Sequence, residues 1–255
     1  MKKETAKIIS QECIATDIYS MWIETKAADT AVPGQFVDLY VHDESKLLPR
    51  PISICEVEDG KLRVVYRVVG CGTKQLSGYK AGDSIELIGP LGNGFSMRDG
   101  KAVLVGGGIG IPPMTELAKQ LSTKIGKENV TAVVGYRDSE LFLKKELEKY
   151  ATVVIATDDG SVGTHGTVID AMDAEKVSGD VMYACGPMPM LRALKTWALD
   201  RDMECQLSLE ERMACGIGAC LACVCKTKEK DAHSNVNNKR ICKDGPVFDA
   251  NEIEL

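Results

Sequence analysis

The hydrophobic pattern of this chain changes near residue 100, and the change separates two parts that require different folds. Before it, short apolar runs alternate with turn residues such as Pro33-Gly34 and Asp59-Gly60. After it, strand-like runs alternate with helical segments. Short strands with regular turns are typical of a small antiparallel barrel, whereas strand–helix alternation is typical of a parallel sheet covered by helices. The sequence therefore predicts a β-barrel over residues 1–98 and an α/β domain over residues 99–205.

The expected elements follow from apolar periodicity and turn residues. Strands are expected at Ala6–Ile9, Ser20–Thr25, Phe36–Val41, Ile52–Val57, Leu62–Val69, Ser84–Ile88, Lys101–Gly106, Asn129–Gly135, Thr152–Ala156 and Asp180–Cys185. Helices are expected at Pro112–Leu121, Leu141–Tyr150, Val168–Met172 and Met188–Leu199. From about residue 206 the alternation ends, and residues 206–255 are predicted to form a small third unit.

Composition and charge exclude two classes of partner. The chain has 31 basic and 37 acidic residues, a formal net charge of -6, so it has no basic surplus for binding nucleic acid. The most apolar run, from Ala102 to Met114, is broken by glycine and proline and is shorter than the roughly 20 residues of a membrane span. No apolar stretch of a signal peptide follows Met1. We therefore expect a cytoplasmic protein that binds neither nucleic acid nor membrane.

Five of the ten cysteines lie between Cys215 and Cys242. Four residues separate Cys215 from Cys220 and two separate Cys220 from Cys223, which is the plant-type spacing for a [2Fe–2S] cluster. Cys242 supplies the distant fourth ligand. Structural zinc is the alternative, but Cys₄ zinc sites generally use two short-spaced pairs. The spacing thus predicts an iron–sulfur site and leaves Cys225 as a packing residue.

Glycines within this cysteine segment have a specific role. Gly216 and Gly218 permit the left-handed backbone that turns amide N–H groups toward a bound cluster. Hydrogen bonds from such amides adjust the reduction potential of the cluster.

Two loops of the α/β part predict a dinucleotide site. The first contains Gly106, Gly107, Gly108 and Gly110 and lies between a strand and a helix that starts with proline. Glycine backbone at a helix N-terminus can approach a pyrophosphate closely, although a tight turn alone also requires some of these glycines. The second loop is Cys185-Gly186-Pro187-Met188, at the end of a later strand, where open α/β sheets bind ligands.

A short motif in the barrel half completes the pattern. In Arg50-Pro51-Ile52-Ser53 the arginine offers a fork for phosphate, and the Ser53 hydroxyl can reach a ring nitrogen. Arg-Pro-x-Ser in a barrel, followed by a glycine loop and by Cys-Gly-Pro-Met before a helix, resembles the ferredoxin–NADP reductase superfamily. The segments 208–220 and 242–248 resemble more narrowly the electron transfer subunits of NAD-dependent dihydroorotate dehydrogenase B.

The resemblance implies an FAD-binding barrel, an NAD-binding domain and a C-terminal [2Fe–2S] unit. It implies a catalytic partner subunit that holds FMN and oxidises dihydroorotate in pyrimidine biosynthesis, in a heterotetramer of two plus two chains. Electrons would pass from this FMN through the cluster and FAD to NAD⁺. The implied FAD contacts are Arg50, Pro51, Ile52, Ser53, Val65, Tyr66, Arg67, Gly72 and Thr73.

Ser53 beside the flavin and Cys185 beside the nicotinamide are the residues expected to act in catalysis. NAD is expected over NADP, because Asp138 and Glu140 follow Arg137 at the end of the second strand of the α/β part and disfavour a 2′-phosphate.

Two other functions remain open from the sequence. One is a ferredoxin:NADP or sulfur-reducing flavin and iron–sulfur reductase subunit, which keeps the fold and changes only the partner. The other is a non-catalytic, redox-sensing or zinc-bound regulatory protein on the same scaffold, which would be colourless.

Overall fold

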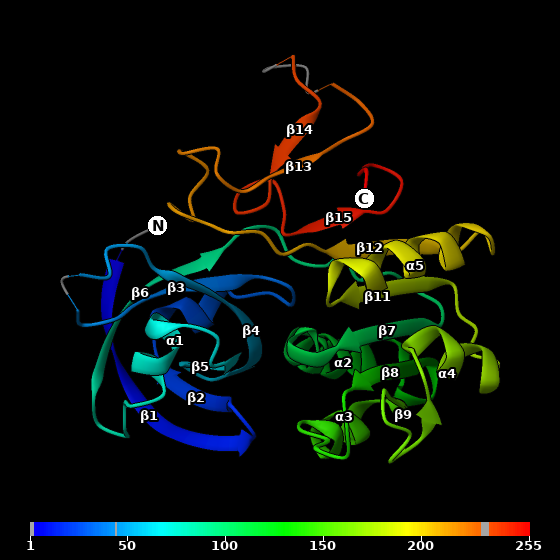
Figure 1. Cartoon of the computed structure of the whole chain (residues 1–255), viewed down its shortest axis with the longest axis horizontal. Coiled ribbons are helices and arrows are strands. Elements are labelled where there is room, and N and C mark those ends of the chain that lie inside the picture. The colour runs from blue at the N-terminus through cyan, green and yellow to red at the C-terminus, as the bar shows by residue number, and fades with distance from the viewer. Residues whose placement is uncertain (1–2, 44, 231–234) are drawn as a thin grey trace.

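The structure is a computed structural model that describes residues 3–43, 45–230 and 235–255. Figure 1 shows a barrel on the left, an α/β unit on the right, and the C-terminal segment above both. Within the described residues, no helix is both long and apolar enough to cross a bilayer.

The first part of the chain forms a closed antiparallel barrel, which confirms the predicted class. Its strands are β1 (Lys3–Ala15), β2 (Ile18–Glu24), β3 (Phe36–Tyr40), β4 (Arg50–Glu58), β5 (Lys61–Arg67) and β6 (Ser84–Leu91). They follow the order β1-β2-β5-β4-β3-β6 around the barrel. Two short helices, η1 (Lys26–Thr30) and α1 (Cys71–Leu76), lie in the connections. Side chains such as Ile8, Val37 and Leu39 fill the barrel and are fully buried.

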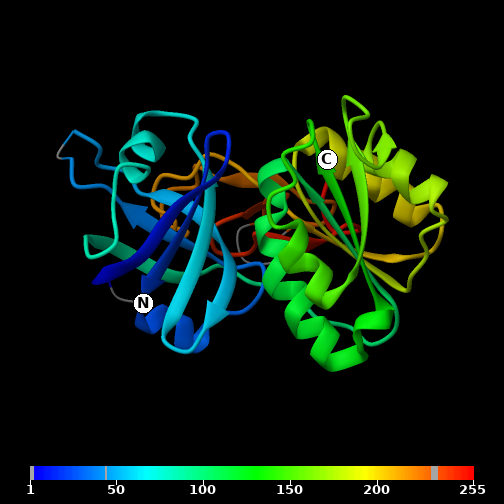
Figure 2. The ribbon, with the colours of Figure 1, turned by 90° about the horizontal axis from the view of Figure 1, so that it is seen from below.

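The second part forms a sheet covered by helices on both faces. Its strands are β7 (Ala102–Gly107), β8 (Val130–Tyr136), β9 (Thr152–Thr157), β10 (Thr164–His165), β11 (Val181–Cys185), β12 (Glu204–Ser208) and β15 (Val247–Asp249), and its helices are η2 (Gly108–Gly110), α2 (Pro112–Ile125), η3 (Lys127–Asn129), α3 (Lys144–Tyr150), α4 (Val168–Ala174) and α5 (Met188–Leu199). The sheet order is β10-β9-β8-β7-β11-β12-β15. Helices α2 and α3 cover one face, and α4 and α5 cover the other (Figure 2).

The C-terminal segment returns to this sheet. β15 pairs antiparallel with β12, and Phe248 lies opposite Leu207. Both side chains are buried, so the pair extends the apolar core across the edge of the sheet. Between β12 and β15, β13 (Val224–Lys226) and β14 (Asn238–Arg240) form a separate two-stranded sheet. The division between the second and third units at residue 205 stays a prediction. β15, from the predicted third unit, pairs with β12 and so joins that unit to the sheet.

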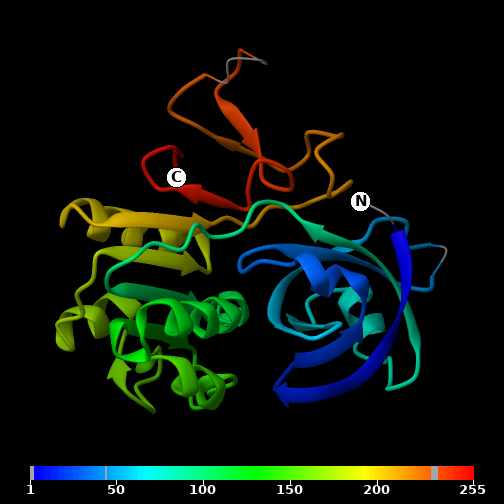
Figure 3. The same ribbon diagram turned by 180° about the vertical axis from the view of Figure 1, so that it is seen from behind.

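Polar contacts hold the three parts together. The backbone N–H of Asn93 donates to the carbonyl of Gly245 at 2.6 Å, and its side-chain amide donates to the carbonyl of Asp244 at 3.0 Å. On the other side of the barrel, the Val57 N–H donates to the buried carboxylate of Glu116 on α2 at 2.9 Å. Figure 3 shows the C-terminal segment lying across the top of both lobes.

Candidate functional site

The four predicted ligand cysteines lie in two adjacent pairs. Cys220 is among the groups that lower the pKa of Cys215, and Cys223 is among those that raise the pKa of Cys242, so each pair lies side by side. The Cys242 backbone N–H also donates to Sγ of Cys223 at 3.4 Å. In the described part of the chain, no three Cys, His, Asp or Glu side chains surround a single metal position. Two pairs of thiols fit a two-iron cluster, in which each iron takes two cysteine ligands.

The loop between these cysteines directs backbone N–H groups at sulfur. The N–H of Gly218 donates to Sγ of Cys242 at 3.1 Å, and that of Ala219 donates to Sγ of Cys215 at 3.2 Å. Gly216 and Gly218 have φ of 65° and 83°, the left-handed conformation expected from the sequence. Amide donors of this kind stabilise thiolate charge and therefore suit a cluster of thiolate-bound iron.

The two pairs differ in electrostatic environment. Burial disfavours the Cys215 thiolate, but N–H donors from Ile217, Ala219 and Cys220 outweigh it and lower the pKa of Cys215 to about 6. Burial and the adjacent Cys223 raise the pKa of Cys242 to about 12. Metal binding requires thiolates, so iron bound here would displace the proton of Cys242.

An arginine that the sequence did not single out anchors the cysteine loop. Arg240 donates from Nη1 to the carbonyl of Gly218 at 3.2 Å, and from Nε to Oδ2 of Asp244 at 2.9 Å. The same ion pair keeps the pKa of Asp244 below its usual value. Arg240 precedes Cys242 by two residues, which was the only hint in the sequence of its position.

The two predicted nucleotide loops meet at neighbouring strands. β7 and β11 pair in parallel, with Cys185 opposite Gly106. A Cβ atom added at Gly110 would lie 2.2 Å from the carbonyl oxygen of Cys185 and 2.7 Å from Cα of Gly186. A glycine is therefore required for the loops to touch, and together they form one glycine-lined edge of the sheet.

Cys185 lies in this edge as a neutral thiol. Burial raises its pKa to about 12, and its thiol interacts with the side chain of Ser208 on β12. A thiol with this pKa does not act as a base near neutral pH. The position of Cys185 is compatible with the expected place beside a nicotinamide, where its thiol would line the site. Pro187 and Met190 pack close to Gly107 in the same edge.

The predicted flavin residues fall on β4, β5 and α1. The Arg50 guanidinium packs against Gly72, where an added Cβ would lie 1.9 Å from Nε. Pro51, Ile52 and Ser53 follow Arg50 along β4 and are half-buried. Arg50 and Gly72 are thus in contact although they are 22 residues apart in the chain, and their role in binding a pyrophosphate stays a prediction.

The remaining predicted flavin residues have different surroundings. Tyr66 is 1% exposed and stacks on Tyr19 within the barrel. Val65 is 2% exposed. The Thr73 hydroxyl accepts the N–H groups of Val69 and Gly70 and caps the start of α1.

Arg67 faces the other lobe. A Cβ added at Gly108 would lie 3.6 Å from Nη2 of Arg67, so the barrel and the nucleotide loop approach each other here.

The expected basis for NAD preference is changed by a contact between the lobes. The Glu140 carboxylate accepts the N–H and the hydroxyl of Thr16, the latter at 2.9 Å. Asp138 accepts the N–H of Glu140 at 2.9 Å. Glu140 therefore ties the segment after β8 to the barrel, which leaves Asp138 as the acidic side chain on which the predicted NAD preference rests.

We expect the dissociation constant for FAD to be at least about ten-fold higher in the variant Arg50→Ala than in the unmodified protein. The reason is that one charge-assisted contact to phosphate is worth roughly 1.5–3 kcal/mol. Flavin retained after gel filtration, read at its visible absorbance, measures the effect. Arg201→Ala is the control, since Arg201 stacks on Trp197 at the far end of α5. Equal retention in both variants would contradict the assignment of Arg50.

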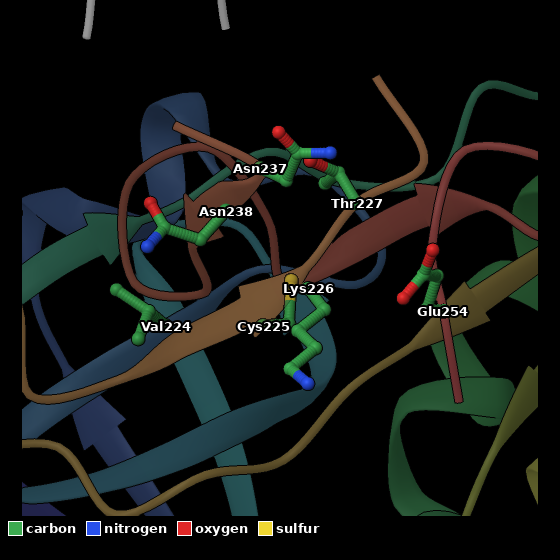
Figure 4. A pocket seen from close by; sticks show the side chains of 7 residues that line it. All are labelled: Val224, Cys225, Lys226, Thr227, Asn237, Asn238 and Glu254. Carbon is green, nitrogen blue, oxygen red and sulfur yellow. The ribbon is translucent and has the colours of Figure 1, made fainter. Parts of the chain in front are cut away.

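A groove with a volume of about 500 Å³ lies beside the two-stranded sheet. Its lining residues are Val224, Cys225, Lys226, Thr227, Asn237, Asn238 and Glu254 (Figure 4). Cys225 is half-buried here and packs against the core that contains Phe248. Its surroundings fit the packing role expected for the extra cysteine.

Comparison with known proteins agrees with this arrangement of sites. Residues 210–254 match the family described as the iron–sulfur cluster binding domain of dihydroorotate dehydrogenase B, and residues 104–196 match the oxidoreductase NAD-binding domain. Two curated relatives carry the name dihydroorotate dehydrogenase B (NAD(+)), electron transfer subunit. The one from Geobacillus sp. (strain WCH70) is 43% identical and covers 100% of both chains. The one from Caldanaerobacter subterraneus is 42% identical and covers 98% of both.

Solved structures with the same fold complete the comparison. A structure of an NADH-dependent reduced ferredoxin-NADP oxidoreductase superposes with a TM-score of 0.86 at 31% identity, covering 98% of this chain and 89% of that one. A ferredoxin NADP⁺ reductase from Neisseria gonorrhoeae superposes at 0.66 and 17% identity over 78% and 92%, which shows the fold alone. On the full-length identity to its curated relatives, the chain belongs to the family of electron transfer subunits of dihydroorotate dehydrogenase B.

Proposed function

We propose that this chain passes electrons from a catalytic subunit, which oxidises dihydroorotate with FMN, to NAD⁺ in pyrimidine biosynthesis. The observation that carries the proposal is the contact between the four-cysteine loop and the barrel wall. Gly216 of the loop packs on β3, which pairs directly with the Arg50–Ser53 segment of β4. This packing supports electron transfer between a cluster on the cysteines and a flavin on the barrel.

The residues present fit the three groups that such a subunit requires. Two thiol pairs with inward N–H donors fit a [2Fe–2S] cluster, the Arg50–Gly72 cradle fits FAD, and the Gly110–Cys185 edge fits a nicotinamide dinucleotide. When bound, FAD exchanges hydride with a nicotinamide and single electrons with an iron–sulfur cluster. The chain's own residues bind, orient and shield these groups.

Each proposed site residue has one task in this arrangement. Arg50 holds phosphate, and the Ser53 hydroxyl donates to a ring nitrogen of the flavin. Gly106, Gly107, Gly108 and Gly110, together with Gly186, Pro187 and Met188, let the dinucleotide approach the sheet edge. Cys185 excludes water beside the nicotinamide without changing its proton at neutral pH.

Replacing Ser53 by alanine is expected to slow NADH oxidation roughly ten-fold, because the loss of one hydrogen bond near the reactive ring is worth about 1.4 kcal/mol. The visible spectrum of the cluster should not change. Stopped-flow reduction of the flavin by NADH measures the rate, and a Ser178→Ala variant, exposed in the loop before β11, is the control. An unchanged rate would show that the Ser53 hydroxyl has no role in the reduction of the flavin.

We place the catalytic partner against the cysteine loop, with two copies of each chain in the complex. Ile217 and Leu221 are 43% and 62% exposed beside the proposed cluster ligands, whereas Leu207 on β12 is fully buried in the core. Exposed apolar side chains next to a one-electron site suit a docking contact. A cytoplasmic location belongs to this proposal, since all ten cysteines are free thiols and disulfides persist in oxidising compartments.

A second candidate is a ferredoxin–NADP oxidoreductase subunit. The 31% identity and TM-score of 0.86 to such a protein favour it over unrelated reductases. The same cofactors would serve it, so only the electron donor distinguishes the two functions.

The decisive experiment is anaerobic purification with the FMN subunit. Dihydroorotate should bleach the flavin and cluster absorbance, and NAD⁺ should restore it. Bleaching by reduced ferredoxin alone would favour the second candidate. A colourless protein would contradict both and favour the regulatory alternative.

A further inference from the structure

Asp38 is a fully buried aspartate in the wall of the barrel. Its side chain lies on β3, is 0% exposed, and neither carboxylate oxygen has a hydrogen-bond partner among the described residues. A buried polar group without a partner costs roughly 1–3 kcal/mol, and more when it is charged. Such a group in a folded protein therefore requires an explanation.

The carboxyl group lies directly beneath the cysteine loop. Val37 and Leu39 point into the barrel core, so Asp38 points to the opposite face of β3. Gly216, the residue after Cys215, packs on that face: an added Cβ would lie 1.8 Å from Oδ2 and 3.2 Å from Oδ1. With a φ of 65° as well, position 216 accepts only glycine, and the absence of a side chain brings the loop onto the carboxyl group.

The same carboxyl group adjoins the flavin segment. Asp38 lies opposite Pro51 in the antiparallel pair of β3 and β4. Directly opposite residues point to the same face with Cβ atoms about 4.5–5.5 Å apart. Asp38 therefore lies between the segment proposed to hold FAD and the loop proposed to hold the cluster. Burial and the nearby Cys215 raise its pKa to about 6.

We propose that Asp38 is a positioning residue whose carboxylate keeps the reduction potential of the cluster low, acting from beneath the loop without touching substrate. The inference rests on the proposed function, because it requires a [2Fe–2S] cluster on the four cysteines. Reduction adds one electron and therefore one negative charge to the cluster. A fixed carboxylate beside it, in a site with little water, disfavours that added charge. The reduced cluster then donates its electron more readily.

The test is a potentiometric titration of anaerobically purified, cluster-loaded protein, followed by the EPR signal of the reduced cluster. At about pH 8.5, where carboxyl groups are ionised, the near-isosteric Asp38→Asn should favour cluster reduction about ten-fold, a rise of about 59 mV for one electron. Asp38→Leu, which also removes the charge, should shift the potential in the same direction. Asp17→Asn is the matched control, since Asp17 is exposed in the turn between β1 and β2, away from the C-terminal segment (Figure 1).

Each outcome separates the inference from the function on which it rests. Equal potentials in the unmodified protein and both Asp38 variants, with iron content intact, overturn the inference. Loss of the cluster in both variants, with full iron in Asp17→Asn, shows a purely structural role and also overturns it. Unmodified protein without iron and acid-labile sulfide overturns the proposed function instead.

Discussion

The variant Cys242→Ser is expected to lose its cluster, and the variant Cys225→Ser is expected to keep it. Cys242 is 2% exposed, receives the Gly218 N–H on its sulfur and lies against Cys223, so its sulfur has a fixed position beside a second predicted ligand. Iron and acid-labile sulfide should fall to roughly a tenth of the unmodified level or less, because binding free energy at such sites is also folding free energy.

The control is matched in chemistry and in place. Cys225 lies two residues after Cys223, is half-buried, and borders the groove beside β13 rather than the thiol pairs. Iron analysis and visible absorbance of anaerobic samples compare the two variants. If Cys225→Ser lost the cluster and Cys242→Ser retained it, the proposed ligand set would be wrong. Electron transfer to a one-electron acceptor should fall with the iron content, while reduction of FAD by NADH continues.

The variant Gly110→Ala is expected to lose about 2–3 kcal/mol of unfolding free energy, because the added methyl group collides with backbone and the backbone cannot rotate away. The collision involves the carbonyl oxygen of Cys185 at 2.2 Å and Cα of Gly186 at 2.7 Å. Separating the two loops opens the glycine edge, so the dissociation constant for NADH should rise about ten-fold or more, which is 1.4 kcal/mol or more.

Urea unfolding and NADH titration measure the two effects independently. Gly78→Ala is the control, because among the described residues not adjacent in the chain only the carbonyl oxygen of Gln75, at 3.3 Å, lies within 4 Å of an added Cβ, and the site is exposed. It should change neither quantity by more than about 0.5 kcal/mol. If Gly110→Ala bound NADH as tightly as the unmodified protein, the contact between the two loops would not be part of the nucleotide site.

Sequence patterns predicted the fold class well because its elements are long and regular. Pro112 marked the start of α2 correctly, since proline suits a first helical turn. The helix runs four residues past the predicted end at Leu121, because Ser122, Thr123 and Lys124 are polar and interrupt the apolar stripe before Ile125, which packs on the core again. The barrel strands were predicted within a few residues, except that β1 is longer than its apolar run.

Other features depend on contacts between distant residues and left no local pattern. β15 has three residues and forms only because β12 offers an edge about 40 residues earlier in the chain. Arg240 reaches Gly218 across the cysteine loop, which spacing cannot indicate. Asp38 carried a weak hint, an acidic residue within the apolar run Phe36–Val41, but its neighbour Gly216 is far away in sequence. The ligand roles of the cysteines were inferred from spacing and remain predictions.

The pairing of β12 with β15 has a consequence for how the iron site forms. All four cysteines lie between these two strands in the chain, so closing the edge of the sheet ties the ends of one loop that contains them. Burial of Leu207 and Phe248 in the core offsets the entropic cost of bringing the ends of this loop together. Iron then has only to order a segment whose two ends are already fixed. Cluster insertion should accordingly follow folding of the nucleotide lobe. Substitutions that weaken the β12–β15 pairing should leave the thiols present but unable to retain metal.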